Sequence, residues 1–243
     1  MLPLLIALQF LSSLPIRLPG MPAPEQLGRS LLYYPVVGLL LGGLLCLAAF
    51  VLDGAPPSLQ AALLLTLWVA LTGALHLDGL ADSADAWLGG LGDRDRTLAI
   101  MKDPRSGPVA VVVLALLLLL KFTALLALLH AQQYSALLLA PALGRAALLA
   151  LFACTPYVRP NGLGHAMAEH LPLGRARAVL ALVAVCSLLF GSDGVVALVL
   201  AAVTFMLARR AMRRRLGGTT GDTAGALLEL MECVVLVGLA LQL

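Results

Sequence analysis

Long runs of apolar residues, separated by short polar segments, make up most of this chain. Because a helix needs about 20 mostly apolar residues to cross the hydrocarbon layer of a bilayer, each long run predicts a transmembrane helix. The fifth and sixth runs are short for a full crossing. The seven candidate spans are residues 30–52, 57–75, 108–129, 135–153, 177–191, 194–208 and 223–242.

A shorter apolar run, MLPLLIALQFLSSL, occupies residues 1–14. It is too short to cross a bilayer comfortably, and it lacks the basic start and small-residue cleavage site of a signal peptide. We expect a helix at the membrane surface or packed on the bundle. The predicted fold is therefore an all-α, polytopic transmembrane helix bundle of about seven spans with an N-terminal interfacial helix. Neither a repeat nor a linker divides it, so residues 1–243 are predicted to form a single integral membrane domain.

Composition supports the membrane assignment. Of the 243 residues, 61% are hydrophobic and 12% are charged, and the mean hydropathy is +0.99. One soluble core of this size could not bury so much apolar surface. The 4 cysteines are scattered without a C-x-x-C spacing, so they indicate neither a zinc site nor a disulfide framework.

The basic residues all lie on one side of the predicted spans. Of the 16 Lys and Arg residues, all except Lys121 and Arg145 lie outside the spans or at their ends, in loops that face the same side. Basic residues accumulate in cytoplasmic loops, so we expect an integral protein of the cytoplasmic (inner) membrane whose C-terminus lies outside. The net charge of +3 is then a topology signal, and it gives no support to nucleic-acid binding. The loops expected in the cytoplasm are about 76–107, 154–176 and 209–222.

Three aspartates follow directly on the second apolar segment, in HLDGLADSADAWLGG at residues 76–90. Asp78, Asp82 and Asp85 are spaced at i, i+4 and i+7, so a helix would place them on one stripe. Like charges on a stripe repel unless a cation lies among them, and a few hard oxygen ligands favour Mg²⁺, with Mn²⁺ as a substitute. The small residues between them would let a ligand come close. We therefore prefer a metal site, with a solvated acidic face as the alternative.

The following loop, GLGDRDRTLAIMKDPRSGP at residues 90–108, mixes basic side chains with glycines and aspartates. Beside a carboxylate metal site such cations suit phosphoryl chemistry, because the metal neutralises developing charge while Lys and Arg hold non-bridging oxygens. Taken alone, the loop could be a topological anchor. The candidate residues of this loop are Arg94, Arg96, Lys102, Asp103 and Arg105.

Polar residues also open the last span and continue into it. Asp222, Glu229 and Glu232 share one face of the predicted helix, and carboxylates inside a span are costly unless they are functional or paired. Glycines and threonines just before them would present free N–H groups to an anion at the helix N-terminus. These anion-binding candidates are Gly218, Thr219, Thr220 and Gly221.

The two basic residues inside spans are expected to meet these carboxylates. Counted at 1.5 Å per residue from the cytoplasmic ends of their helices, Arg145 and Glu229 both lie about 10 to 12 Å deep. We expect Arg145 to lie close enough to Glu229 to interact, with Lys121 deeper. A transporter with an intramembrane ion path is the alternative use of these charges. It is disfavoured because the polar residues gather towards one face of the membrane and no repeat is visible.

Taken together, these segments resemble the cobalamin synthase family, the adenosylcobinamide-GDP ribazoletransferases of cobalamin (vitamin B12) biosynthesis. The resemblance rests on HLDGLADSADAWLGG, LAIMKDPRSG and GGTTGDTAGALLELME, with shorter matches at QFLSSLPI, YYPVVGLLLG, LGR and YVRPNGLGHAM, and it runs along nearly the whole chain. It implies an integral membrane transferase that joins adenosylcobinamide-GDP to α-ribazole or its 5′-phosphate, releases GMP and needs Mg²⁺.

That reaction suits the candidate residues, because a ribazole hydroxyl would attack the diphosphate in line with the departing GMP. The expected metal ligands are Asp78, Asp82 and Asp85, with Asp222 or Glu229 in addition. The expected phosphate-holding residues are Lys102, Arg105 and Arg145. The alcohol proton would pass to Asp82 or His76, although His76 could equally be a helix-end histidine. Further candidate substrate contacts are Arg94, Arg96, Asp103, Gly218, Thr219, Thr220, Gly221, Asn161 and His165, the last more often a solvent-exposed bystander.

The expected partners are the corrinoid nucleotide and ribazole substrates and the lipid bilayer. A homo-oligomer and contacts with other late cobalamin enzymes are left open. The main enzymatic alternative is a CDP-alcohol phosphotransferase, which does similar chemistry in a membrane helix bundle with metal-binding aspartates. Its signature, D-G-x2-A-R-x8-G-x3-D-x3-D, contains an Arg that DGLAD lacks, and the later aspartates of this chain are spaced differently.

Overall fold

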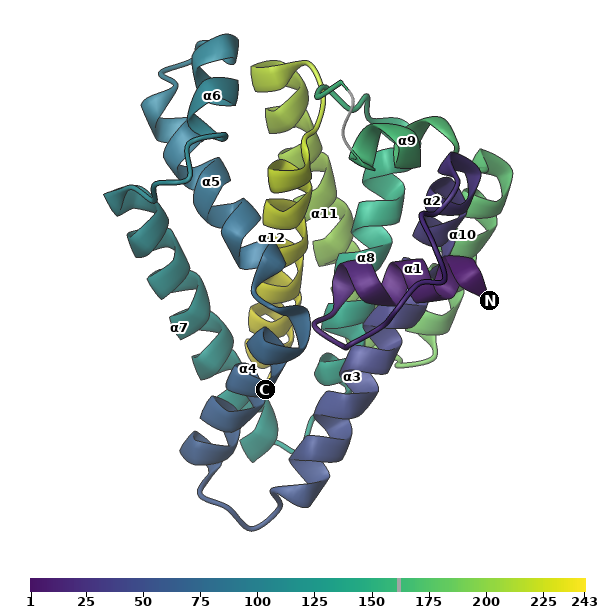
Figure 1. Ribbon diagram of the computed structural model, residues 1–243. Helices are drawn as coiled ribbons and strands as arrows, with labels where there is room; N and C mark the ends of the chain where they lie inside the picture. Colours follow the sequence, from purple (N-terminus) through teal and green to yellow (C-terminus); the bar gives the residue numbers. More distant parts are fainter. Residues whose placement is uncertain (161–162) are drawn as a thin grey trace.

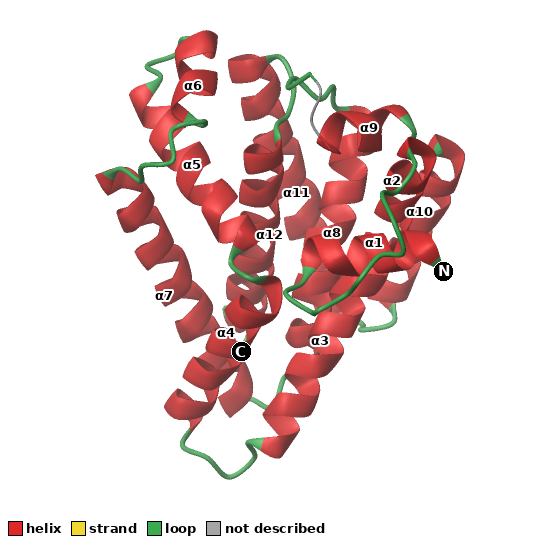
Figure 2. Ribbon diagram, in the orientation of Figure 1, coloured by secondary structure: helices red, strands yellow, loops and turns green. Residues whose placement is uncertain are grey.

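The computed structural model describes residues 1–160 and 163–243, and the regular structure in this part of the chain is helical (Figures 1 and 2). The all-α fold predicted from the sequence is confirmed. In chain order the helices are α1 (Leu2–Leu11), α2 (Pro24–Ser30), η1 (Leu31–Tyr33), α3 (Tyr34–Val51), α4 (Pro57–Thr72), α5 (Leu75–Gly89), α6 (Arg94–Ile100), α7 (Pro108–His130), α8 (Ser135–Cys154), α9 (Leu163–Glu169), α10 (Leu173–Leu188), α11 (Ser192–Leu216) and α12 (Gly221–Ala240).

The long helices form a polytopic membrane bundle. Among residues 1–160 and 163–243, five segments are long and apolar enough to cross a bilayer, and the number rises to seven if the bent pairs α4–α5 and α9–α10 each count as one span. The short N-terminal helix α1 lies across the long helices (Figure 1) and buries Ile6, Ala7 and Leu11 against them. The bundle and its short first helix therefore agree with the sequence pattern.

The second predicted span is broken just before the aspartates. Gly73 and Ala74 both have positive φ angles, of 61° and 56°, and α5 leaves α4 at an angle of 87°. The loop after α1 covers this break, because Ser13 donates its hydroxyl to the Ala70 carbonyl at 2.6 Å and its backbone N–H to the Leu71 carbonyl at 2.7 Å. The aspartates thus lie on a helix, as their spacing predicts, and this helix occupies the first part of the segment 76–107 that was expected to be a loop.

Two basic segments that the sequence predicts to lie in loops are helical instead. Helix α11 continues through the arginine-rich run to Leu216, where the last turn places three arginines near the negative end of the helix dipole and Gly217 ends the helix with a φ of 77°. Helix α6 begins after Asp93, whose carboxylate accepts the Arg96 N–H at 2.7 Å.

Helix α12 lies inside the bundle, against α5, α7, α8 and α11. Small residues allow the close contacts: a side chain on Gly144 of α8 would meet Glu232 of α12 at 3.2 Å, and Gly42 of α3 faces the α8 backbone at Leu137. The three predicted basic loops share one end of the bundle, at the top of Figure 1, where α6, the α8–α9 connection and the α11–α12 turn meet. This end contains the candidate site.

Candidate active site

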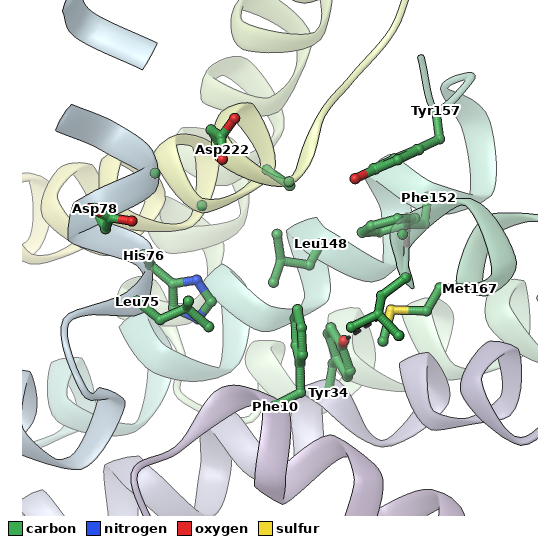
Figure 3. A pocket seen from close by; sticks show the side chains of 16 residues that line it. Phe10, Tyr34, Leu75, His76, Asp78, Leu148, Phe152, Tyr157, Met167 and Asp222 are labelled. Atoms are coloured by element: carbon green, nitrogen blue, oxygen red, sulfur yellow. Dashed lines mark hydrogen bonds between the residues drawn. The ribbon is translucent and has the colours of Figure 1, made fainter. Parts of the chain in front are cut away.

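Helix α5 and the first turn of α12 touch through glycines. A side chain on Gly79 would lie 2.9 Å from the Asp222 carbonyl oxygen and 3.1 Å from its Cα, and one on Gly225 would lie 3.3 Å from the His76 Cα. No side chain fits at Gly79 without moving one helix. The contact brings the carboxylates of Asp78 and Asp222, from separate helices, to the edge of one cavity (Figure 3).

This cavity has a volume of about 230 Å³, and its walls include two pairs of aromatic rings. Phe152 and Tyr157 stack with ring centroids 5.9 Å apart, and Phe10 and Tyr34 stack at 6.3 Å. The Tyr34 hydroxyl donates to the sulfur of Met167 at 3.7 Å. In Figure 3 the carboxylates lie at one side of the cavity and the aromatic rings at the others.

His76 lies in the first turn of α5 and lines the same cavity. Its side chain is buried, with 4% of the residue exposed, and within the described residues its Nε2 has no hydrogen-bond partner. A buried polar atom without a partner is unfavourable by about 1–3 kcal/mol. The described protein groups therefore leave the hydrogen-bonding capacity of the His76 Nε2 unused.

Asp222 is tied to the connection between α8 and α9. Arg159 forms an ion pair with the Asp222 carboxylate at 2.7 Å, and the Thr219 N–H donates to the Pro156 carbonyl at 2.8 Å. Between these contacts the Tyr157 ring lies beside the cavity, and burial raises the pKa of its phenol above the ordinary value. The phenol stays protonated near neutral pH and can donate a hydrogen bond.

The threonines before α12 cap that helix. Thr220 accepts the Thr223 N–H at 3.2 Å through its hydroxyl, while its own N–H donates to the Thr223 hydroxyl at 2.9 Å. Thr219, Thr220 and Thr223 are all buried. These contacts occupy N–H groups that the sequence offers to an anion, so the start of α12 has fewer free donors than expected.

Asp85 has a structural role in this conformation. Its carboxylate accepts the Gly107 N–H at 2.5 Å and the Ala110 N–H at 2.9 Å, and so caps the start of α7.

Asp78, Asp82 and Asp85 share the face of α5 that the spacing predicts, but no group of three His, Cys, Asp or Glu side chains among residues 1–160 and 163–243 lies close enough to hold a metal ion. The aspartate stripe is thus not a preassembled three-carboxylate centre, because Asp85 is committed to α7.

The loop cations do not line this cavity, and Arg105 lies with Asp103 and Asp85 around a separate pocket. Arg105 donates to the Asp103 carboxylate from its backbone N–H at 3.1 Å, from Nε at 2.9 Å and from Nη2 at 2.7 Å, and these bonds lower the pKa of Asp103 to about 2. Arg94 donates to the Leu216 carbonyl at 2.9 Å. Arg96 and Lys102 are exposed.

The charges inside the spans form one buried network. Lys121 Nζ donates to Glu229 at 2.6 Å and to Glu232 at 2.7 Å, and Arg145 bonds Glu232. The Lys121 ammonium also lies 5.1 Å from the centroid of the Trp68 ring. Arg145 therefore joins the same network as Glu229, but its direct partner is Glu232. The structure places Arg145 and Glu229, expected at the phosphates and the metal, in the interior of the bundle and away from the cavity lining.

Two further candidates belong to the α8–α9 region. His165 is exposed on α9, with its Nε2 3.9 Å from the Glu169 carboxylate. Asn161 lies outside the described residues.

Comparison with known proteins identifies the family of this chain. A family model described as cobalamin-5-phosphate synthase matches residues 3–240. The chain belongs to this family. No solved structure matches the chain.

Relatives that resemble the chain from end to end share one name, adenosylcobinamide-GDP ribazoletransferase. The protein of Stutzerimonas stutzeri (strain A1501) is 77% identical over 242 residues, which are 100% of this chain and 99% of the relative. The protein of Pseudomonas fluorescens (strain Pf-5) is 68% identical over 99% of this chain and 100% of the relative. The protein of Pseudomonas putida (strain KT2440) is 65% identical over the whole of both chains.

Membership of the cobalamin-5-phosphate synthase family confirms the resemblance seen in the sequence. The structure adds Phe10, Tyr34, Tyr157 and Arg159, to which residue patterns assigned no role. The available signal was their place in the matching segments QFLSSLPI, YYPVVGLLLG and YVRPNGLGHAM. Their chemical types alone would not have separated them from ordinary packing and surface residues.

Proposed function

We propose that this chain is an adenosylcobinamide-GDP ribazoletransferase, which joins adenosylcobinamide-GDP to α-ribazole or its 5′-phosphate and releases GMP. The observation that carries the proposal is the match, along the entire length, to relatives of that name at 77% and 68% identity. The geometry supports it, because carboxylates of α5 and α12 meet beside an aromatic cavity at the basic end of the bundle.

In the proposed reaction a ribazole hydroxyl attacks the phosphorus that carries the corrinoid side arm. A new P–O bond forms, the P–O bond to the GMP oxygen breaks, and GMP leaves with that bonding pair. The hydroxyl proton passes to a carboxylate of α5, for which we propose Asp82, one helical turn beyond Asp78. The protein's main contribution is to hold the two substrates in line at this edge.

The acidic residues at this edge fit a magnesium ion in their donor chemistry. Mg²⁺ prefers hard oxygen ligands and is usually held by one or two carboxylates together with waters and substrate phosphates, so it does not need a closed protein cluster. We propose that Asp78 and Asp222, which line one cavity, hold it together with substrate oxygens, with Mn²⁺ as a substitute, while Asp82 accepts the proton. When bound, the ion neutralises charge on the diphosphate. Asp85 is left out because both of its carboxylate oxygens accept α7 backbone N–H groups, and Glu229 because it is buried beside Lys121 outside the cavity lining. Asp222 stays in the set because Arg159 pairs with its Oδ2 and leaves Oδ1 for the ion.

We assign the phosphate contacts to the loop between α5 and α7. Lys102 and Arg105 are exposed there and can reach outward for a diphosphate, with Arg94 and Arg96 on the same loop. Arg105 first has to exchange its bonds to Asp103 for bonds to phosphate oxygens.

We also propose that the site faces the cytoplasm from the inner membrane. The support is that the loops at the site end are rich in arginine and lysine. Basic residues accumulate in the cytoplasmic loops of membrane proteins. The bulky, polar corrinoid nucleotide then reaches the site from the aqueous side of the bundle.

The direct test is GMP release by purified protein in detergent or liposomes. We expect release to require both adenosylcobinamide-GDP and ribazole or its phosphate, to stop with a chelator, and to return on addition of Mg²⁺ or Mn²⁺. A CDP-alcohol with a free alcohol acceptor serves as the control and should give no CMP. Absence of ribazole-dependent GMP release in the presence of metal would refute the proposed function.

A further inference from the structure

We infer that the aromatic cavity between α1, α3, α5, α8, α9 and α12 binds the heteroaromatic base of the ribazole substrate, and that His76 donates from Nε2 to the free ring nitrogen of that base. This inference rests on the proposed function and deepens it, because it says which part of which substrate enters the cavity. The ribose then lies at the carboxylate side, towards Asp78 and Asp222.

The size of the cavity limits what can enter it. Its volume of about 230 Å³ lies below the range of about 300–1,000 Å³ typical of pockets for drug-sized ligands. One fused ring system fits such a space, whereas a corrin macrocycle does not. The remaining choice is between the two flat bases of the reaction, guanine and the dimethylbenzimidazole of ribazole.

The walls favour a flat and apolar group. Phe10 and Tyr34 form one stacked pair with an interplanar angle of 19°, and Phe152 and Tyr157 form the other at 15°. Aromatic side chains bind planar bases by stacking, whatever hydrogen-bonding pattern the base has on its edge. The buried thioether of Met167 adds a further soft, polarisable contact.

The hydrogen-bonding groups in the cavity lining favour dimethylbenzimidazole over guanine. Guanine has several donors and acceptors on its edge, and each would need a partner when buried. Dimethylbenzimidazole, once linked to ribose, has a single acceptor nitrogen. The Tyr34 hydroxyl is already bonded to Met167. The carboxylates of Asp78 and Asp222 at the cavity edge are assigned to the metal, so the side-chain donors left in the lining are the His76 Nε2 and the Tyr157 hydroxyl. A single acceptor nitrogen needs one donor, and we assign His76 to it.

The position of His76 relative to the carboxylates fits the chemistry. His76 and Asp78 lie two residues apart on α5, and the cavity joins them to Asp222 and Tyr157. A base held at His76 therefore places its attached ribose towards the α5–α12 edge, where the attacking hydroxyl is required. The cavity orients the nucleophile, and the basic loop outside it is left for the diphosphate.

The test measures the KM of each substrate separately in variants of the cavity residues. We expect His76→Leu to raise the KM for ribazole at least about tenfold with no more than a twofold change in the KM for adenosylcobinamide-GDP. His76→Gln, which retains an N–H donor, should recover part of the loss. Phe10→Ala should raise the KM for ribazole about fivefold, by loss of stacking. The matched control is Phe190→Ala, because Phe190 has the same 37% exposure as Phe10 and lies at the end of α10 away from this cavity.

A binding measurement keeps the inference separate from the proposed function. The fluorescence of α-ribazole should be quenched when it binds the purified chain, excess guanosine should not restore the signal, and His76→Leu should weaken binding at least about tenfold. Gel filtration and circular dichroism check that the variants are folded. Quenching that fails in wild-type protein, a KM shift for adenosylcobinamide-GDP instead of ribazole, or a loss of kcat alone in His76→Leu would each overturn the inference. Absence of GMP release with intact ribazole binding would overturn only the proposed function.

Discussion

Lys121 holds two carboxylates together in the middle of the bundle. It donates to Glu229 and Glu232, while Arg145 neutralises Glu232 from α8. Two positive and two negative side chains therefore compensate one another where water is excluded, and α7, α8 and α12 are joined by their bonds. Charged groups at this depth are tolerated only in such pairs.

Removing one charged side chain of this network should lower the stability of the protein, because an opposite charge then stays buried without a partner. In Lys121→Met, Glu229 loses its cation, so we expect a loss of about 3–5 kcal/mol in the free energy of unfolding. Unfolding of the purified protein in mixed micelles with increasing SDS measures the change. The double variant Lys121→Met/Glu229→Gln removes the uncompensated charge and should recover a large part of the loss. Wild-type stability in the single variant would show that the network contributes nothing.

The sequence predicts that the buried charges lie close together, but it does not predict which of them pair. Counting helix depth correctly places Arg145 near the carboxylates of the last span, but depth does not say which side of α12 faces α8. Gly144 brings α8 close to Glu232, and the direct bond goes there. In the same way, spacing places Asp85 on the aspartate face of α5, while only the position of α7 shows that its carboxylate binds backbone N–H groups.

At the scale of elements, the contact between α5 and α12 sets the geometry of the site. Gly79 is the point of closest approach, and the helix that it contacts begins at the Asp222 turn. Because the two proposed metal ligands Asp78 and Asp222 come from different helices, any change in the helix separation changes the distance between their carboxylates.

The variant Gly79→Ala should force these helices apart. We expect overpacking to cost about 1–3 kcal/mol of stability and the activity to fall more than tenfold, because misplaced carboxylates lose their common ligand. Unfolding in micelles and GMP release measure the two effects. Gly43→Ala on α3 is the control: Gly43 is exposed and helical, and a methyl group added there would meet nothing within 4 Å, so stability and activity should stay unchanged. Equal behaviour of the two variants would contradict the assigned contact.

Hydrophobic periodicity predicts the number and order of the spans, because each apolar run has to cross the bilayer. It misses the break at Gly73 and Ala74, since that turn is held by Ser13, a residue distant in the chain. It also ends α11 too early, because the arginine-rich run is polar although its residues are good helix formers. Long-range contacts and helix propensity thus set boundaries that hydropathy alone cannot.

For the whole molecule, all three basic loops lie at the site end, and the α3–α4 turn lies at the opposite end (Figure 1). The segregation of charge predicts the orientation of the bundle, because arginines and lysines stay on the cytoplasmic side. We therefore expect the site to be open to the cell interior.

Reporter fusions in a Gram-negative host test this orientation. Alkaline phosphatase, which is active only outside the cytoplasm, should be active when fused after Leu243 and inactive when fused after Leu216, at the end of α11. Both fusions should be present in the membrane at similar levels. The reverse pattern of activity would show that the bundle is inserted the other way round.

The central claim is that the carboxylates at the α5–α12 edge carry out the transfer. The most direct measurement is the rate of ribazole-dependent GMP release by Asp82→Asn at saturating substrates and Mg²⁺, beside the control Asp95→Asn, whose side chain is 88% exposed on the basic loop. We predict that Asp82→Asn lowers kcat by at least about 100-fold with the helical fold and the stability retained, and that Asp95→Asn stays within twofold of wild type. A wild-type kcat for Asp82→Asn would contradict the claim.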